Sequence, residues 1–113
     1  MPKNFKPDCI FCQIANHKLK GKIINENEQF VAFYDIKPMS QGHTLVIPKQ
    51  HIDDFNHLVQ QESTFMKKYL EFINQTKNKL AEQYHPQGVR ILFNTDKLIE
   101  VWHLHAHLIP VYD

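Results

Sequence analysis

The chain has 113 residues, 42% of them hydrophobic, and a formal net charge of +1 at pH 7. A chain of this length should form one domain, residues 1–113, that buries roughly 65% of the surface exposed by the unfolded chain. The near-neutral charge argues against binding to nucleic acid or to an anionic membrane, and no apolar run approaches the ~18 residues of a membrane span. Because the N-terminal segment is polar and lacks the apolar core of a signal peptide, we expect a cytoplasmic protein.

The first predicted element is a short helical turn over residues 9–16, which carries both cysteines in the run Cys9-Ile-Phe-Cys12. A structural disulfide does not suit a reducing compartment, and a thioredoxin-like motif should follow a strand, whereas a polar tail precedes Cys9. Cys-x2-Cys is a common half of a zinc site, which needs two further ligands from elsewhere in the chain. The other interpretation is that Cys9 and Cys12 are small core residues.

Short β-branched or aromatic runs between turn signals predict three strands, at residues 23–25, 30–34 and 44–47. A hairpin turn over residues 25–28 should join the first two, and a loop over residues 36–42 should lead to the third. Pro48 should end the third strand because it cannot donate to a ladder, and Asp53 should cap a short helix.

Apolar residues recur at helical spacing between Glu62 and Tyr84, which predicts one long amphipathic helix. Such a stripe most often packs on the core, although a partner helix is the alternative. The last two strands are expected at residues 89–93 and 101–109. One long helix and one or two short helices, segregated from about five strands, predict an α+β fold with an antiparallel sheet.

The last predicted strand carries three histidines, His103, His105 and His107, in the run Val101-Trp-His-Leu-His-Ala-His-Leu-Ile-Pro110. Strict alternation is the period of a half-buried strand, so the three imidazoles should share one face while the apolar residues between them pack behind. A neutral imidazole is both a nucleophile and a metal ligand. The pattern therefore predicts a chemical role for this face.

The pattern His-φ-His-φ-His-φ-φ at residues 103–109 resembles the signature of the histidine-triad family. The resemblance extends to Cys-Ile-Phe-Cys-Gln-Ile at residues 9–14, Phe-Tyr-Asp-Ile-Lys-Pro at residues 33–38, and His-Thr-Leu-Val-Ile-Pro-Lys-Gln-His-Ile at residues 43–52. Together with Asn94, these segments cover nearly the whole chain and look most like the Hint-type branch of small nucleotide-binding phosphoramidases. The resemblance implies an α+β fold and a homodimer in which two sheets join edge to edge.

In relatives that keep both cysteines, the resemblance implies a zinc ion held by four residues, which here are Cys9, Cys12, His51 and His103. Because a complete Cys2His2 shell leaves no open coordination position, this zinc would be structural.

The same resemblance assigns the nucleophile to His105, which would attack the α-phosphorus of a nucleotide and carry the nucleotidyl group until water removes it. The other ring nitrogen of His105 must keep its proton and donate it, for example to a backbone carbonyl. His107 would hydrogen-bond the phosphoryl or leaving-group oxygen, and His43 is expected to contact these histidines from behind without touching the substrate.

A purine nucleotide is the implied substrate. Asp35 would accept the ribose hydroxyls, and Asn94 would meet the phosphate or the ribose. The resemblance also implies that the base lies among Ile10, Phe11, Ile14, Phe33 and Ile36. Taken singly, each of these apolar residues is more often core than pocket.

The chain departs from the family pattern just before the histidines. A Gly-rich loop that ends in Gln and then Ser or Thr is usual there, whereas residues 94–101 contain no glycine and place Ile99 and Glu100 at those two positions. A carboxylate beside a phosphate is repulsive unless it is protonated or turned away, although Lys97 is a cation in the same loop.

These patterns predict a homodimeric histidine-triad hydrolase that cleaves nucleoside 5′-phosphoramidates or related conjugates at the α-phosphorus. One alternative is a nucleotide-binding regulatory module with little turnover, and another is a dinucleoside polyphosphate hydrolase. A third is a metallohydrolase that uses His103, His105 and His107 together as metal ligands.

Overall fold

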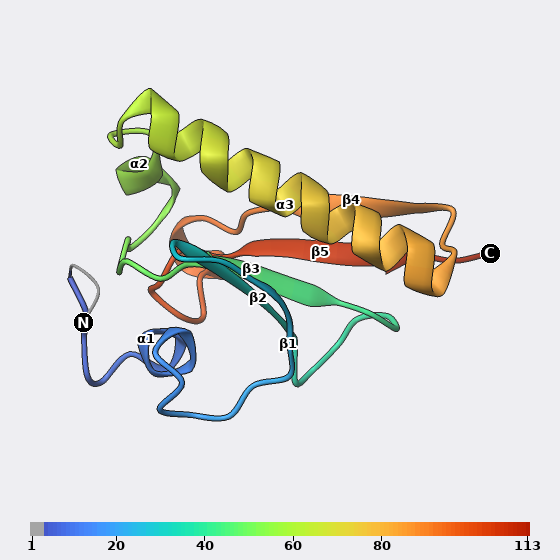
Figure 1. Ribbon diagram of the computed structural model, residues 1–113, viewed down its shortest axis with the longest axis horizontal. Helices are drawn as coiled ribbons and strands as arrows, with labels where there is room; N and C mark the ends of the chain where they lie inside the picture. The colour runs from blue at the N-terminus through green and yellow to red at the C-terminus, as the bar shows by residue number, and fades with distance from the viewer. Residues whose placement is uncertain (1–3) are drawn as a thin grey trace.

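The computed structural model describes residues 4–113 and contains helices and strands in mixed order (Figure 1). The elements are α1 (Ile10–Ala15), β1 (Ile23–Glu26), β2 (Phe30–Tyr34), β3 (Thr44–Pro48), α2 (Phe55–Leu58), α3 (Ser63–Tyr84), β4 (Gly88–Leu92), a 3₁₀ turn at Asp96–Leu98, and β5 (Ala106–Val111). Within the described part of the chain, no helix is long and apolar enough to cross a membrane.

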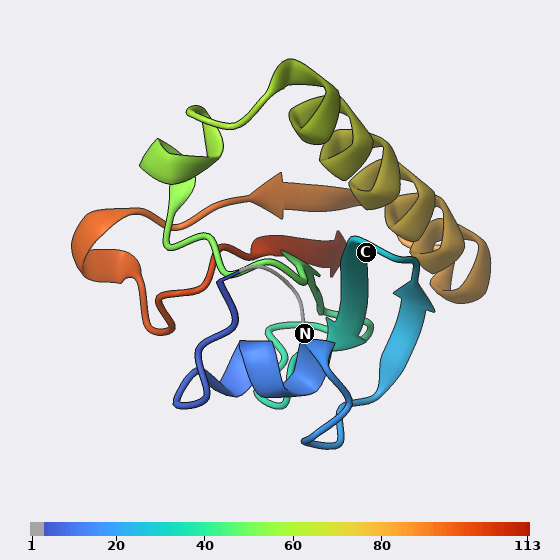
Figure 2. The ribbon, with the colours of Figure 1, turned by 60° about the vertical axis from the view of Figure 1, so that its left-hand side comes forward.

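The strands form one antiparallel sheet in the order β1-β2-β3-β5-β4. The long helix α3 covers one face and the short helix α1 lies on the opposite face (Figures 1 and 2). The α+β prediction, with about five antiparallel strands, one long helix and two short ones, is confirmed.

Alternating residues of the central strands divide the core between the two faces. Ala32 and Val46 pack toward α3, whereas Val31 and Leu45 belong to a second cluster under α1. Strand side chains point alternately to opposite faces. In a sheet that is covered on both sides, the central strands therefore have a nearly continuous apolar sequence. This second cluster matters for function because it anchors the N-terminal segment that carries the cysteines.

The amphipathic helix is confirmed, and its stripe faces the sheet. The buried residues of α3 are Tyr69, Phe72, Ile73, Thr76 and Leu80. The helix ends at Tyr84 and is capped by His85, which has a left-handed backbone and whose N–H donates to the carbonyl of Ala81; Pro86 follows.

The strand predicted over residues 101–109 is wrong in its bounds, because β5 begins at Ala106 and runs to Val111. The ladder with β3 starts at the Val46–Ala106 pair, and β3 itself ends at Pro48. Proline has no N–H to donate, and its carbonyl oxygen lies 2.7 Å from Nε2 of His103. The triad therefore begins in a segment of irregular backbone, and of the three histidines His107 alone lies in the strand.

Two local predictions also need correction. Asp54, not Asp53, caps α2, because the Asp53 carboxylate lies 2.8 Å from the ring of His51 instead. The first strand extends to Glu26, so the hairpin turn starts at Asn27, whose side chain accepts from the backbone N–H of Phe30.

Candidate functional site

Four ligand-type side chains from three separate segments meet at the end of the sheet, and we call them the Cys–His cluster: Cys9, Cys12, His51 and His103. Their sulfur and nitrogen atoms all lie within 4.8 Å of one another. Nδ1 of His103 lies 3.3 Å from Sγ of Cys9 and 3.4 Å from Sγ of Cys12. Nδ1 of His51 lies 3.3 Å from the Cys12 sulfur.

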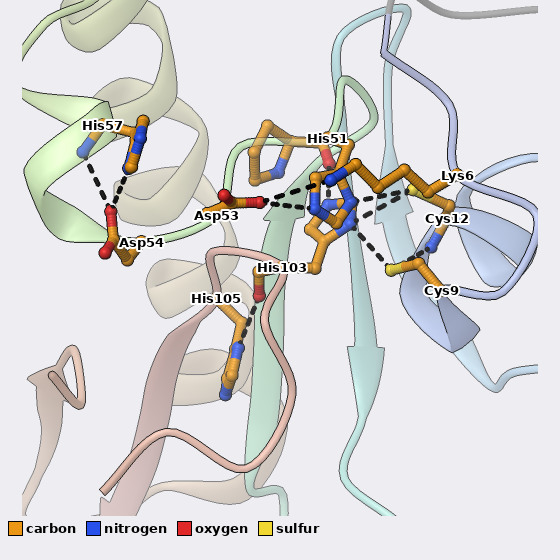
Figure 3. A network of polar contacts seen from close by, with 10 residues as sticks. Lys6, Cys9, Cys12, His51, Asp53, Asp54, His57, His103 and His105 are labelled. Carbon is orange, nitrogen blue, oxygen red and sulfur yellow. Dashed lines mark hydrogen bonds and ion pairs between the residues drawn. The ribbon is translucent and has the colours of Figure 1, made fainter. Parts of the chain in front are cut away.

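Local structure positions each member of the cluster. Cys9 is the N-cap of α1, and its sulfur accepts the backbone N–H of Cys12 at 3.3 Å, so one helical turn places both sulfurs on the same side. The far ring nitrogens are also occupied, with Nε2 of His51 2.8 Å from the Asp53 carboxylate and Nε2 of His103 2.7 Å from the Pro48 carbonyl (Figure 3). Such outer contacts orient a metal-binding histidine and keep its other nitrogen unprotonated.

The cluster fits a tetrahedral metal ion. A zinc ion with Zn–S bonds of about 2.3 Å and Zn–N bonds of about 2.05 Å would separate sulfur from nitrogen by about 3.5 Å, close to the separations present. Burial raises the pKa of the Cys12 thiol to about 11 and lowers the pKa of His103 to about 4. The imidazole is therefore neutral and able to bind a metal, whereas a thiolate at this buried position needs a cation beside it.

The triad histidines do not converge on one point. Within residues 4–113, His103, His105 and His107 form no group of three ligand atoms close enough for one metal ion. Figure 3 shows His103 turned toward the cysteines and His51, and His105 turned away from them. This arrangement argues against the metallohydrolase alternative.

His105 lies next to the Cys–His cluster but has a different environment. Its Nδ1 lies 2.8 Å from the carbonyl oxygen of His103, so this nitrogen carries the proton and donates it to the backbone, as expected from the sequence. Within residues 4–113, Nε2 has no hydrogen-bond partner, and the ring is half-buried against the edge of Phe11 at a centroid distance of 5.2 Å. Burial lowers the pKa of His105 more than nearby groups raise it, which favours the neutral ring. Nε2 of His105 therefore carries a lone pair that no described residue uses.

A chain of hydrogen bonds sets the tautomer of His107. The backbone N–H of Met39 donates to Nδ1 of His43 at 3.0 Å, so the proton of a neutral His43 is on Nε2. That nitrogen lies 2.9 Å from Nδ1 of His107, which must then accept, and this leaves a proton on Nε2 of His107. Nδ2 of Asn94 lies 3.3 Å from Nε2 of His107. The two ends of an amide are interchangeable by a 180° turn, which places the Asn94 oxygen here as the acceptor of the His107 proton.

Burial keeps both linked histidines neutral. It lowers the pKa of His107 to about 4, with the neighbouring His105 and His43 acting in the same direction. It also lowers the pKa of His43, although the carboxylate of Asp35, 3.6 Å away, opposes the shift. We call this group the His105 site: His105, His107, His43, Asp35 and Asn94. It combines an imidazole lone pair with a directed N–H donor.

The HIT domain family matches residues 16–113 of this chain. The chain belongs to the HIT family. An uncharacterised HIT-like protein of Mycoplasma genitalium is 36% identical over 115 residues, covering 100% of this chain and 79% of the relative. A bifunctional adenosine 5′-phosphosulfate phosphorylase/adenylylsulfatase of Arabidopsis thaliana is 34% identical over 88% of this chain and 67% of its own length.

Solved structures of HIT proteins have the same fold as this chain. A HIT family protein from Bacillus anthracis superposes with a TM-score of 0.85 at 31% identity, over 95% of this chain and 75% of its own. A zinc-bound histidine triad family protein from Mycobacterium smegmatis superposes with a TM-score of 0.83 at 29% identity, over 94% of this chain and 76% of its own.

In this HIT protein, the apolar residues predicted to hold a base divide into two groups. Phe11, Ile14 and Phe33 are buried in the cluster under α1, where the rings of Phe11 and Phe33 meet edge to face at 5.4 Å. Ile10 and Ile36 remain 45% and 90% exposed, so they present apolar surface to solvent.

Other functional residues of the HIT protein did not stand out in the sequence. Pro48, Asp53 and Met39 each orient a histidine, two through backbone atoms and one through a carboxylate. Backbone groups have no sequence signature, because every residue carries a carbonyl. The spacing His51-x-Asp53 is a signal for the carboxylate contact, but the capping role that we predicted for Asp53 obscured it.

Proposed function

We propose that this HIT protein is a nucleotide-binding hydrolase of the Hint type that cleaves nucleoside 5′-phosphoramidates or related conjugates at the α-phosphorus. The observation that carries the proposal is the state of His105, whose Nδ1 donates to the His103 carbonyl while Nε2 stays unprotonated and has no hydrogen-bond partner among residues 4–113. A neutral imidazole held in this way attacks without a partner base. The Arabidopsis relative, which is named for two reactions of adenosine 5′-phosphosulfate, supports an adenine nucleotide as substrate.

In the proposed reaction, the lone pair on Nε2 of His105 forms a bond to the α-phosphorus, and the bond between phosphorus and the amine nitrogen breaks. The amine leaves with that electron pair and takes a proton from solvent. Water then attacks the phosphorus and gives up a proton to solvent, the bond to Nε2 breaks, and the released AMP-type product leaves His105 with its lone pair restored. When substrate is bound, a phosphoryl oxygen would replace the Asn94 amide oxygen as the acceptor of the N–H on Nε2 of His107, and this N–H would stabilise charge on the phosphoryl oxygens in both steps.

The nucleotide would lie between the α1 side and the loop that follows β2. Ile10 and Ile36 supply exposed apolar surface for a purine, backed by the buried Phe11, Ile14 and Phe33. Asp35 is an acceptor for ribose hydroxyls, and its Oδ1 already accepts the backbone N–H of Lys37 at 3.0 Å, which orients it. Asn94, beside His107, would meet the phosphate.

We also propose a structural zinc ion in the Cys–His cluster. When bound, the ion would supply only rigidity, because four protein ligands leave it no open position. It would tie α1 to the segment that begins the triad and so hold the carbonyl of His103 against His105.

The direct test is turnover of adenosine 5′-phosphoramidate or a fluorogenic AMP-amide. Wild-type protein should release AMP, and rapid quench should trap an acid-labile adduct on histidine. His105→Asn should abolish both signals and still bind AMP. His85→Asn is the matched control, because His85 is exposed at the end of α3 in a left-handed conformation that asparagine accepts. An adduct that persists in His105→Asn would contradict the proposal.

A second candidate is a nucleotide-binding module with little turnover, which the altered loop before the triad favours. Ile99 is half-buried and Glu100 is exposed in a segment that has no glycine. If AMP binds and no amide or anhydride is cleaved, this candidate replaces the first. The double variant Ile99→Gln with Glu100→Ser should then restore activity if the loop, not the triad, is the missing part.

A homodimer is part of the proposal, and the edge strand β4 supports it. β4 pairs only with β5 in the described chain, so its other edge offers backbone N–H and carbonyl groups to a second copy. Ile91 on this strand and Leu70 on α3 are 47% and 59% exposed. Sedimentation velocity at micromolar concentration should give a dimer, and Ile91→Asp should shift it toward monomer.

A further inference from the structure

The loop between β2 and β3, residues 35–43, carries two members of the His105 site but has little packing of its own. Asp35 and His43 lie at its two ends, where the N–H of Asp35 donates to the carbonyl of His43 at 3.0 Å. Between them, the side chains of Ile36 and Met39 are exposed. Because exposed side chains make few contacts, hydrogen bonds rather than packing hold the backbone of this loop. One of the groups held in this way is the N–H of Met39, which donates to His43.

A tight turn follows Met39 directly. The N–H of His43 donates to the carbonyl of Ser40 at 3.1 Å, and Gly42, at the third position of the turn, has a φ of +88°. A Cβ on Gly42 would lie 3.0 Å from the ring of Tyr84 at the end of α3, so the turn packs closely against that ring. The turn fixes His43 relative to Ser40, and the position of Ser40 therefore sets the position of the preceding Met39 N–H.

Two side-chain hydrogen bonds tie this turn to the end of β5, and we call them the turn clamp. The hydroxyl of Ser40 donates to the carbonyl of Pro110 at 2.6 Å. In return, the hydroxyl of Tyr112 donates to the carbonyl of Gln41 at 2.7 Å. Figure 1 shows the loop between β2 and β3 at the end of the molecule where the chain finishes. The clamp thus joins the loop to the strand that carries His107.

The N–H of Met39 decides the direction of the hydrogen bond between the two linked histidines. While Nδ1 of His43 accepts this N–H, the ring proton is on Nε2, and His107 accepts it at Nδ1. If the Met39 N–H moves away, the proton of His43 can occupy Nδ1 instead. Nε2 of His43 would then accept from His107, whose own Nε2 would lose its proton. The carboxylate of Asp35, 3.6 Å from Nε2 of His43, favours the first arrangement, but it is also the acceptor that we assign to the ribose.

We propose that Ser40 and Tyr112 are positioning residues, which act through Met39 and His43 to keep the N–H on Nε2 of His107. The inference rests on the proposed function and identifies what directs its phosphoryl donor. Neither hydroxyl touches His43, His107 or the proposed nucleotide, since both are used on backbone carbonyls. The clamp sets the tautomer of a pair of histidines through the backbone of a loop.

The direct test is nuclear magnetic resonance of the imidazole nitrogens in zinc-loaded protein with isotope-labelled histidine, with signals assigned from His43→Gln and His107→Gln. In wild type, both rings should carry the proton on Nε2. Ser40→Ala and Tyr112→Phe should each move part of both rings to the Nδ1-protonated form, and the double variant should move more. The two rings should change together, because they share one hydrogen bond. Unchanged tautomers in both single variants would overturn the proposal.

Tyr34→Phe is the matched control for Tyr112→Phe. The hydroxyl of Tyr34 lies 2.9 Å from that of Tyr84, so this change removes one tyrosine hydrogen bond near the turn without touching the loop backbone. It should lower the free energy of unfolding about as much as Tyr112→Phe and leave both tautomers unchanged. Ser40→Thr keeps a hydroxyl donor and should keep the wild-type spectrum. An equal tautomer shift in Tyr34→Phe would overturn the proposal, because the clamp would then contribute only general stability.

Turnover of an AMP-amide gives a second measurement. Ser40→Ala and Tyr112→Phe should each lower kcat by about threefold to tenfold, since one hydrogen bond is worth about fivefold in an equilibrium. KM should change by less than about twofold, because neither side chain contacts the proposed nucleotide. A rise in KM with unchanged kcat in both variants would overturn the positioning role.

The tautomers also separate this inference from the proposed function, because they are measured in free protein without turnover. If wild type cleaves no AMP-amide, the proposed function fails, and the spectra of Ser40→Ala and Tyr112→Phe still decide the role of the clamp. If wild type turns over and the spectra of all variants match it, the clamp fails alone. Added AMP should enlarge the tautomer shift in the variants, since its ribose would occupy the carboxylate of Asp35.

Discussion

The first two histidines of the triad lie in opposite environments. His103 is fully buried, with Nδ1 against two sulfurs and Nε2 against the Pro48 carbonyl. His105, two residues later, is half-buried and uses only Nδ1, so its Nε2 is available. The comparison teaches that His103, with both nitrogens occupied within the Cys–His cluster and its outer contact, holds the structure together, whereas His105, with one occupied nitrogen, is oriented and still able to react.

The strongest test of this difference between His103 and His105 is to remove a sulfur ligand from the Cys–His cluster. Cys12→Ser should lose the bound zinc and lower the free energy of unfolding by about 3 kcal/mol or more, with Tm lower by about 10 °C or more, because metal-binding energy is folding energy. Elemental analysis and thermal unfolding measure the two effects. Wild-type protein stripped by a chelator should unfold like Cys12→Ser. Full zinc content in Cys12→Ser, with loss in His105→Ala, would reverse the roles of the two histidines.

The next test addresses the His105 site. His107→Ala should lower kcat for an AMP-amide on the order of 10²–10³-fold, because one directed N–H donor to the phosphoryl group is lost. Zinc content should not change, since His107 lies outside the Cys–His cluster. His85→Asn serves as the control for a histidine removed from the surface, because asparagine accepts the left-handed backbone at this position. A change of less than threefold in His107→Ala would mean that this N–H does not act on the reacting group.

A smaller change tests the outer contact of the cluster. Asp53→Asn should weaken zinc affinity by about 10- to 100-fold, because the carboxylate that accepts from Nε2 of His51 becomes a neutral amide. Its neighbour gives a matched control: Asp54→Asn alters the cap of α2 and does not touch His51. Competition with a chromophoric chelator measures the affinities. Equal affinities for the two variants would show that Asp53 does not support the metal site.

The last test concerns the pH dependence of stability. Burial holds the pKa of folded His107 at about 4, below the ~6.5 of an unfolded histidine, so the unfolded state binds the proton first as pH falls. This group should therefore reduce stability progressively from about pH 6.5 down to about pH 4, and add nothing further below that. Urea unfolding of His107→Gln should show a shallower loss of stability over this window than wild type. Parallel slopes for the two proteins would contradict the assignment.

The predicted strand at the triad was correct in its alternation and wrong in its extent. Leu104, Ala106 and Leu108 all pack in the core under α3, as period two predicts, even though β5 begins only at Ala106. The early residues follow an extended path without a ladder, because Pro48 ends the neighbouring strand and the N–H of Leu104 donates to Ile52 at 2.6 Å instead. Periodicity reports which face a side chain takes, and it does not report which backbone partner is present.

The sequence by itself determined the elements and their faces, because hydrophobic periodicity and turn residues act over a few positions. It also determined the four members of the Cys–His cluster, although only through the family resemblance. Tertiary structure alone decided which histidine has a nitrogen available. The groups that occupy the rings come from far along the chain, with Cys12 91 positions and Pro48 55 positions from His103. The tautomer of His107 likewise depends on a backbone N–H at Met39 that no side-chain pattern encodes.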